Sequence, residues 1–224
     1  MPLNNLSEFQ AAVERHVQDD ANVLDAADYQ QHLEDAARRL SRIEPREVVL
    51  DIAGDGGFDY ALPAPFDPDF SRVLQVEYPA GRREPEYVDH LDWTLYTDPA
   101  GTALRFRYAS PAAAEVIRVT VTASHEITAV STTVPVARQD AVVLIGAALS
   151  CEAIASHYSN TGDATILADS VDHKSKAGDY AKRAKRYMEL ATELLPVAVQ
   201  GEVQAGSGTT SLAESRNFLT HPER

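Results

Sequence analysis

The sequence predicts an α+β fold: a bundle of about four helices, interrupted by an inserted antiparallel β domain and followed by a flexible C-terminal tail. Two changes in the spacing of apolar residues support this prediction. A helical period of 3.6 gives way to a period of two at Arg46 and returns at Ala137. After Pro196 the composition becomes rich in glycine, serine and threonine. The expected parts are a helical module over 1–45 and 137–196, a β domain over 46–136 and a tail over 197–224.

Two helices are expected before the β domain. The first spans residues 5–18 and is capped by Asn5 or Ser7. The second spans residues 21–43, carries arginines in its last turn and is closed by Pro45. The side chains expected to face the core are Leu6, Phe9, Val13 and Val17 in the first helix, and Val23, Ala27, Leu33, Ala37 and Leu40 in the second.

Short apolar runs between turn-forming residues predict an antiparallel sheet, closed or sandwiched, between residues 46 and 130. The GDGG run at 54–57 is a turn rather than a phosphate-binding loop, because it lacks the Gly-Lys-Ser/Thr ending and no helix follows. Residues 58–71 contain three prolines and should be irregular or an edge strand. Residues 80–93 should be an exposed loop or a poorly paired strand. The expected strands are 48–54, 72–79, 93–98, 103–110 and 115–127.

Two helices of opposite character are expected after the β domain. Residues 138–159 carry apolar side chains on two faces, which is typical of a central core helix. Residues 171–195 form an amphipathic helix that ends before Pro196. The apolar positions expected to be covered are Val142, Leu144, Ile145, Ala148, Leu149, Cys151, Ala153 and Ala155 in the first, and Tyr180, Ala184, Tyr187, Ala191 and Leu194 in the second.

Composition and charge limit the function classes. The chain of 224 residues has a net charge of −14, which argues against wrapping DNA but is compatible with surrounding a channel through which DNA slides. The single cysteine, Cys151, cannot form an internal disulfide and is expected to be a buried hydrophobe. The N-terminus shows no signal pattern, and no run approaches the roughly 20 apolar residues of a membrane span, so a soluble cytoplasmic product is expected.

The charges are separated along the chain. Residues 1–45 hold nine acidic residues against four arginines, whereas residues 172–187 hold six basic residues against two aspartates. This separation indicates complementary surfaces between copies of the chain or with an acidic partner, and a solvated helix face is the alternative. The candidate interface residues in the basic segment are Lys182, Arg183, Lys185 and Arg186.

No residue is assigned a catalytic, cofactor-binding or metal-binding role, so the chain is not expected to be an enzyme. Ser150, Cys151 and His157 lie in one helix, but the six-residue step from the cysteine to the histidine puts them on opposite faces. Asp169 and Asp172, beside His173, fit a helix N-terminus better than a metal site. No cofactor is expected.

The tail ends with an apolar pair. Residues 201–224 have the composition of a segment that is disordered alone, and Phe218 and Leu219 interrupt it near the end. A flexible segment with an apolar tip is typical of a latch that orders on docking, and these two residues complete the candidate interface. A disordered terminus without a role is the alternative.

Four segments in order resemble the head–tail adaptor (connector, head-completion) proteins of tailed bacteriophages and prophages. They are GDGGFDYALP, FSRVLQVEYP, GTALRFRY and ADSVDHKSKAGDYAKRAKRY. The C-terminal part of the likeness, which covers about 60 residues, is the most specific. The long β insertion departs from the minimal family pattern, in which the protein is little more than a helical bundle.

The resemblance implies a structural virion protein of the head–tail neck, made in the host bacterial cytoplasm. It implies a homo-oligomeric ring, usually of twelve copies, beneath the portal protein. Genomic DNA would pass through the bore without sequence-specific binding, and the other face would meet a tail or stopper protein. The resemblance implies no catalysis and no membrane.

A second hypothesis belongs to another class. In it the β domain is a monomeric ligand- or carbohydrate-binding module, or a dormant enzyme, and residues 78–93 supply the aromatic and charged contacts. The mass under native conditions helps to separate the two hypotheses, because a ring subunit should self-assemble or bind a portal.

Overall fold

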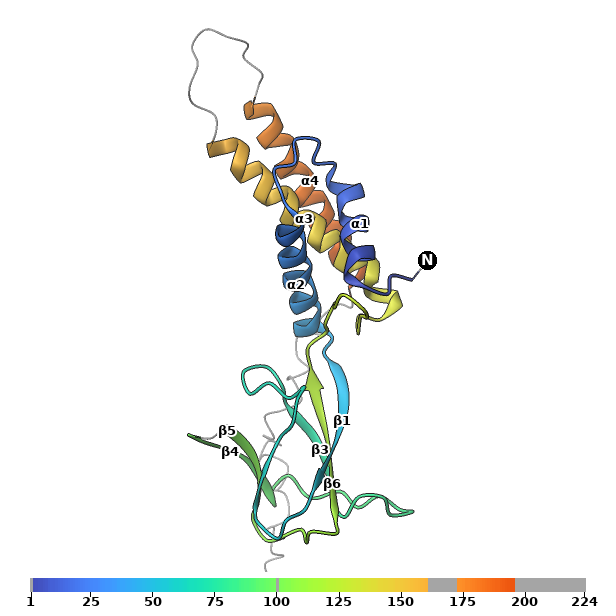
Figure 1. Cartoon of the computed structure of the whole chain (residues 1–224), viewed down its shortest axis with the longest axis vertical. Coiled ribbons are helices and arrows are strands. Elements are labelled where there is room, and N and C mark those ends of the chain that lie inside the picture. The colour runs from blue at the N-terminus through green and yellow to red at the C-terminus, as the bar shows by residue number, and fades with distance from the viewer. Residues whose placement is uncertain (1, 100, 161–172, 196–224) are drawn as a thin grey trace, which may run out of the picture. The chain divides into compact units, whose positions relative to one another are not determined.

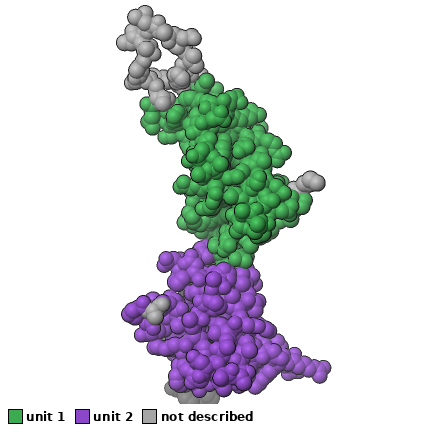
Figure 2. Space-filling view, in the orientation of Figure 1, with its two compact units in different colours: residues 1–46, 123–198 green, residues 47–122, 199–224 purple. Residues whose placement is uncertain are grey.

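The structure is a computed structural model that describes residues 2–99, 101–160 and 173–195. The chain divides into two units, each with its own apolar core, which are coloured separately in Figure 2. Unit 1 comprises residues 1–46 and 123–198 and contains the helices (Figure 1). The described part of unit 2 lies within residues 47–122 and is built from strands. The α+β fold class predicted from the sequence is therefore confirmed.

Four helices make up the described part of unit 1, and α3 lies among the other three (Figure 1). Their bounds are α1 Leu6–Val17, α2 Ala26–Ile43, α3 Val136–Asn160 and α4 His173–Leu194. Each of α1, α2 and α4 packs against α3. The ends of all except α2 agree with the sequence prediction to within about two residues.

The expected start of α2 at residue 21 is wrong, because the helix begins at Ala26 behind a capping box. The Asp25 carboxylate accepts hydrogen bonds from the backbone N–H groups of Ala27 and Asp28, and the Asp28 carboxylate accepts one from Asp25 N–H. Before the cap, Asn22 has a positive φ of 49°. Local side-chain bonds of this kind compete with helix and fix its first residue.

The core of unit 1 surrounds α3. Ile145, Cys151 and Ile154 are buried against residues of the other helices, which confirms that this helix is central. Leu149, expected to be covered, is only partly buried. Gly146 permits close packing, since a Cβ there would lie 3.2 Å from Val13 Cγ2.

By length and composition α3 is also able to cross a membrane, contrary to the expectation that no run would qualify. Within unit 1, however, 61% of its most apolar window is buried. Burial of this extent matches the core helix of a helical bundle.

The seam of α4 agrees with the prediction except at its end. Ala184 and Ala191 are buried, and Tyr180 and Tyr187 pack against the same core. The predicted burial of Leu194 is wrong, because this residue is 43% exposed. Leu195 packs against the core instead, because residues four positions apart lie on the same face of a helix and Ala191 is buried.

The described part of unit 2 contains two three-stranded sheets, ordered β1-β6-β3 and β2-β5-β4. Side chains from both sheets meet in one apolar core, which matches the sandwiched arrangement among the two predicted alternatives. The short β2 is an edge strand in the proline-rich segment, as expected. The strands are β1 Arg46–Ala53, β2 Asp59–Ala61, β3 Val73–Glu77, β4 Trp93–Asp98, β5 Gly101–Phe106 and β6 Val116–Ala123.

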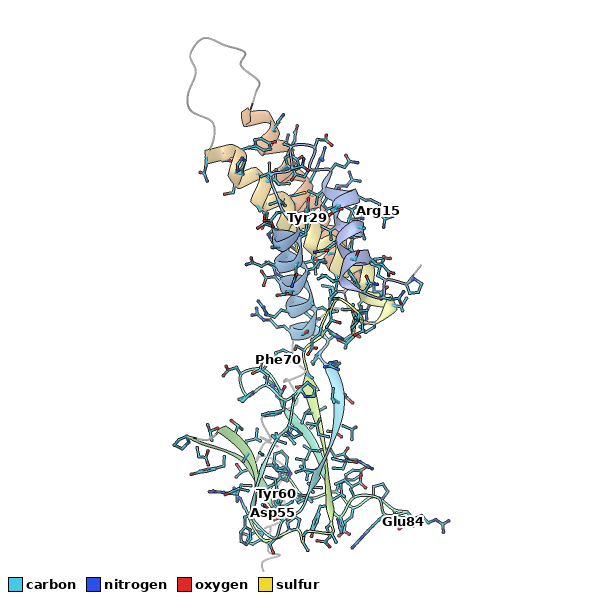
Figure 3. The ribbon with its side chains drawn as sticks, in the orientation of Figure 1. Arg15, Tyr29, Asp55, Tyr60, Phe70 and Glu84 are labelled. Atoms are coloured by element: carbon cyan, nitrogen blue, oxygen red, sulfur yellow. The ribbon has the colours of Figure 1, made fainter. Side chains whose placement is uncertain are left out.

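Polar bonds hold the turns of unit 2 together. The turn predicted from GDGG packs against the segment before β6, where Gly54 N–H donates to Glu115 O at 2.9 Å. Only glycine fits at position 54, because a Cβ there would lie 2.4 Å from Ala112 O. The Tyr60 hydroxyl donates within the same turn, to Gly57 O at 2.8 Å, and Figure 3 labels Tyr60 in this region.

The segment between β3 and β4 is the poorly paired strand that the sequence allowed. Val88 N–H donates to Val76 O, and Tyr78 N–H donates to Glu86 O. One isolated bridge joins the segment to the last residue of β3. These contacts place the segment beside β3 without extending the sheet regularly.

The chain returns to unit 1 at residues 122/123, whereas the sequence placed this boundary at 136/137. His125 accounts for the difference, since it is buried within unit 1. Its N–H donates to Ser41 Oγ at 2.8 Å, and its two ring nitrogens lie 2.9 Å from the carbonyl oxygens of Glu44 and Thr133. An apolar pattern alone gives no sign of such a polar anchor.

Candidate functional site

The possible nucleophiles lie in the core of unit 1. Ser150 and Cys151 are fully buried, whereas His157 is exposed, so the predicted separation of the cysteine and the histidine is confirmed. Burial raises the pKa of the Cys151 thiol to about 11. A thiol held protonated inside a core is unreactive, so Cys151 serves as a small apolar side chain.

A serine–histidine pair that no sequence motif indicated joins two helices of unit 1. Ser150 Oγ lies 2.9 Å from His32 Nδ1, which joins α3 to α2. Burial lowers the pKa of His32, although nearby carboxylates oppose the shift. Within the described residues no carboxylate is hydrogen-bonded to the other ring nitrogen, and the buried serine is closed to a substrate. The pair therefore satisfies a buried hydroxyl rather than forming a catalytic group.

Metal ligands do not gather within the part of the chain that the structure describes, where no three His, Cys, Asp or Glu residues are suitably placed. Asp169 and Asp172 lie outside the described residues, so their assignment to a helix cap stays a prediction. Phe218 and Leu219, the apolar pair of the expected latch, lie outside them too.

The basic segment lies on α4 and divides into two kinds of residue. Lys182, Arg183, Lys185 and Arg186 are all exposed, whereas Ala184 between them faces the core. The lysine side chains are 83% and 80% exposed, with acidic neighbours on the same helix at 3.8 and 4.0 Å. Such exposed pairs contribute little to stability. The guanidinium of Arg186 makes no hydrogen bond or ion pair with any other described residue.

Arg183 differs from the other three because it makes contacts inside unit 1. Its guanidinium lies 5.3 Å from the Tyr180 ring centroid, and its Nη1 is 3.4 Å from Val17 O at the end of α1. Two tyrosines of α4 also donate hydrogen bonds to this end of α1. The Tyr180 hydroxyl donates to Gln18 O at 3.1 Å, and the Tyr187 hydroxyl donates to His16 O at 3.0 Å.

These three side chains of α4 cap the C-terminus of α1. The last carbonyl groups of a helix have no partner within the helix, and donors from a neighbouring helix satisfy them. The spacing of residues 180, 183 and 187 places the donors on one face of α4. The sequence shows this spacing, but it does not reveal that the acceptors belong to α1.

Several acidic residues of the N-terminal segment are exposed on the surface of unit 1. Glu14 on α1, Asp20 in the following loop and Glu34 on α2 are all exposed. Asp35, by contrast, forms an ion pair with Arg38 at 2.6 Å. Exposed carboxylates of α1, α2 and their connecting loop therefore belong to the same unit as the exposed basic side chains of α4, although α2 also carries exposed arginines and α4 exposed carboxylates.

Unit 2 contains a hollow of about 390 Å³ that no sequence motif indicated. Much of its lining comes from the loop to which the second hypothesis assigned the ligand contacts. The residues that line it are Tyr78, Glu86, Tyr87, Val88, Asp89, Asp92, Phe106, Tyr108 and Ala109.

The sequence matches no protein-family model and no curated protein. Solved structures of gene transfer agent (GTA) particles contain chains similar to this one. A chain from the neck of an empty particle, computed with C6 symmetry, is 18% identical. The match covers 76% of this chain and 87% of that one, with a TM-score of 0.29.

Two further structures are similar at the same level. A chain in the neck of the native particle, computed with C12 symmetry, is 17% identical over 80% of this chain and 93% of that one, with a TM-score of 0.27. A chain of the native virion is 16% identical, and the match covers 78% of this chain and 87% of that one, also with a TM-score of 0.27. Likenesses with these TM-scores carry no inference about the fold or the function of this chain.

Proposed function

We propose that this chain is a structural virion protein, a head–tail adaptor that forms a ring under the portal. The ring would extend the DNA channel and provide the docking surface for a tail or stopper protein. The family resemblance is most specific over the C-terminal stretch of about 60 residues that includes the sequences of α3 and α4. The observation that carries the proposal is the basic face of this helix, where Lys182, Lys185 and Arg186 are exposed and contribute little to holding unit 1 together.

This basic face would contact an acidic surface, either of a neighbouring copy or of the portal. The exposed carboxylates of α1, α2 and their connecting loop supply such a surface on every copy. A contact in which the basic face of one copy meets the acidic surface of the next copy, without the reverse contact, would be heterologous, and heterologous contacts form rings when the rotation closes. A ring of twelve copies is the expected stoichiometry. The net negative charge of the chain would let DNA slide through the bore without binding.

A charge-reversal experiment tests the proposal. The variant K182E/R186E changes two exposed residues of α4, and R42E/R83E is a matched control with the same change in net charge at two other exposed arginines. We expect K182E/R186E to lose ring formation or portal binding at low salt, while its folding, followed by circular dichroism, stays normal. Native mass and negative-stain class averages with the portal provide the measurement.

The result separates a solvated helix face from an interface. If K182E/R186E assembles as well as R42E/R83E does, the basic face of α4 plays no part in assembly. A chain that neither forms rings nor binds the portal would favour the second hypothesis, in which unit 2 is a ligand-binding module. The hollow lined by the loop between β3 and β4 is the observation that supports this second candidate.

A further inference from the structure

Four aromatic residues line the hollow of unit 2. Phe106 is buried, with the Tyr78 ring at a centroid distance of 5.8 Å. The Tyr78 hydroxyl donates a hydrogen bond to the Glu115 carboxylate. The other two rings are more open to solvent, since Tyr87 is 55% and Tyr108 is 82% exposed. Aromatic rings left exposed around a concave surface are typical of a binding site.

The charged lining residues of the hollow are all acidic. Glu86 forms an ion pair with Arg82, and Asp89 lies 3.1 Å from the ring of His90. The described lining residues include no lysine, arginine or histidine. The hollow therefore has a negative charge that its neighbours compensate only in part.

Asp92 is the carboxylate that these neighbours leave free. Its backbone is fixed on both sides, because its N–H donates to Asp89 O and its carbonyl accepts from Arg107 N–H, each at 2.9 Å. Its side chain has no hydrogen bond or ion pair with any described residue. Asp92 therefore brings an unpaired carboxylate, on a backbone held by two hydrogen bonds, to the same hollow that the aromatic rings line.

We propose that this hollow binds a lysine or arginine side chain of a partner protein. Asp92 would form the ion pair, and the rings of Tyr87 and Tyr108 would provide cation–π contacts. Unit 2 already contains one such contact, since Arg105 Cζ lies 3.6 Å from the centroid of a tyrosine ring on β4. This proposal does not depend on the adaptor function.

The first test is a titration of the full-length protein, followed by amide NMR shifts. The probe is N-acetyl-arginine amide, and N-acetyl-citrulline amide is the uncharged probe of the same shape. We expect saturable shifts at Val88, Asp92 and Phe106, with a dissociation constant on the order of millimolar. The citrulline probe should bind roughly fivefold more weakly, and added salt should weaken only the arginine probe.

Substitutions locate the site. D92N and Y108A should each weaken binding of the arginine probe roughly fivefold, because each removes one of the two kinds of contact. D69N is the matched control: it removes the same charge from an exposed aspartate of unit 2 that does not line the hollow. This control should bind the probe as the unchanged protein does.

Three results would overturn the proposal. Equal binding of the arginine and citrulline probes would show that charge is not recognised. An effect of D69N as large as that of D92N would show that only overall charge matters. Shifts at the same residues with methyl N-acetylglucosaminide, but not with the arginine probe, would assign the hollow to carbohydrate. None of these results depends on whether the protein forms rings.

Discussion

Units 1 and 2 are stabilised in different ways, although they belong to one chain. In unit 1 a single helix of 25 residues, α3, is surrounded by apolar packing. In unit 2 the strands have three to eight residues, and the turns between them are fixed by polar bonds. Two arginine–aspartate pairs, Arg105 with Asp59 and Arg118 with Asp51, link strands of unit 2.

The difference follows from how much apolar area each kind of element can bury. A long central helix removes many side chains from water, and burial then accounts for most of its stability. Short strands with one exposed face rely more on cross-strand pairs and satisfied turn groups. Unit 1 should therefore lose much of its stability when its core is changed, whereas loss of an exposed charge pair in unit 2 should have a small effect.

Two spectroscopic signals follow the units separately. Trp93, the only tryptophan of the chain, lies in β4 and packs against the core of unit 2, so its fluorescence reports on that unit. Far-UV circular dichroism reports mainly on the helices, which belong to unit 1.

The largest expected effect is that of I145D. Ile145 is 2% exposed in the centre of unit 1, and an aspartate there would bury an unpaired charge at a cost of about 4 kcal/mol or more. We expect the helical signal to be lost, while Trp93 emission keeps the value of folded unit 2, which has its own core. Leu149, only partly buried, should tolerate the same change better than Ile145 does.

The control for I145D is V136D, at the first residue of the same helix. Val136 is 67% exposed, and a negative charge near a helix N-terminus is favourable, so this variant should fold normally. Retention of the helical signal in I145D would contradict the central position of α3. Simultaneous loss of the folded Trp93 emission would show that unit 2 depends on unit 1 for folding.

A smaller effect is expected where unit 1 does use polar bonds. Y180F and Y187F remove hydroxyl donors from the last carbonyl groups of α1, and each should lower the free energy of unfolding by about 0.5–1.5 kcal/mol. Y108F, at an exposed tyrosine of unit 2, is the control and should have no effect. Urea unfolding followed by circular dichroism measures the difference. Neutral behaviour of both α4 variants would show that water replaces the hydroxyl groups.

Acid should affect unit 2 through its arginine–aspartate pairs. Hydrogen bonds from Arg118 and Arg105 hold the pKa values of Asp51 and Asp59 below the ordinary 3.8. Because these pKa values are lower in the folded state than in the unfolded state, the ionised aspartates stabilise the folded state above pH 3.8. This stabilisation is lost as the pH falls through the pKa values that the two aspartates have in the folded state. We therefore expect the thermal midpoint followed by Trp93 to decrease below about pH 4.

The control for the acid effect is D51N/D59N, in which both pairs are already absent. Its midpoint should be lower at neutral pH and should decrease less in acid, and both differences should be small because the pairs are exposed. Equal decreases in the two proteins would assign the acid sensitivity to other carboxylates.

The helices could be predicted from the sequence because the apolar residues themselves define them. The two faces of α3 and the ends of α4 follow from the spacing of apolar residues and from Pro196. The start of α2 was missed, since Asp25 and Asp28 compete with the helix through short-range bonds that apolar spacing does not report. The polar anchor at His125, which draws the following residues into unit 1, was missed for the same reason.

The candidate site was predictable only in part. The charge of the segment around Lys182 is visible in the sequence, but whether each side chain is free or used within the fold is not. Arg183 contacts α1 and a tyrosine ring, whereas Arg186 has no partner within the described residues. The hollow brings Asp92 together with Tyr108, and no local pattern connects the two segments.

The smallest expected effect on folding is that of removing residues 201–224, which lie outside the described residues. Glycine, serine and threonine bury too little apolar area to offset the entropy of ordering, so the thermal midpoints of both units should be unchanged. If the tail is a latch, its loss should weaken portal binding at least tenfold, about 1.4 kcal/mol. F218A/L219A should reproduce most of that loss, and T209A/T210A, which leaves the apolar pair intact, should not. Unchanged portal affinity in the truncated chain would leave the basic face of α4 as the remaining candidate for docking.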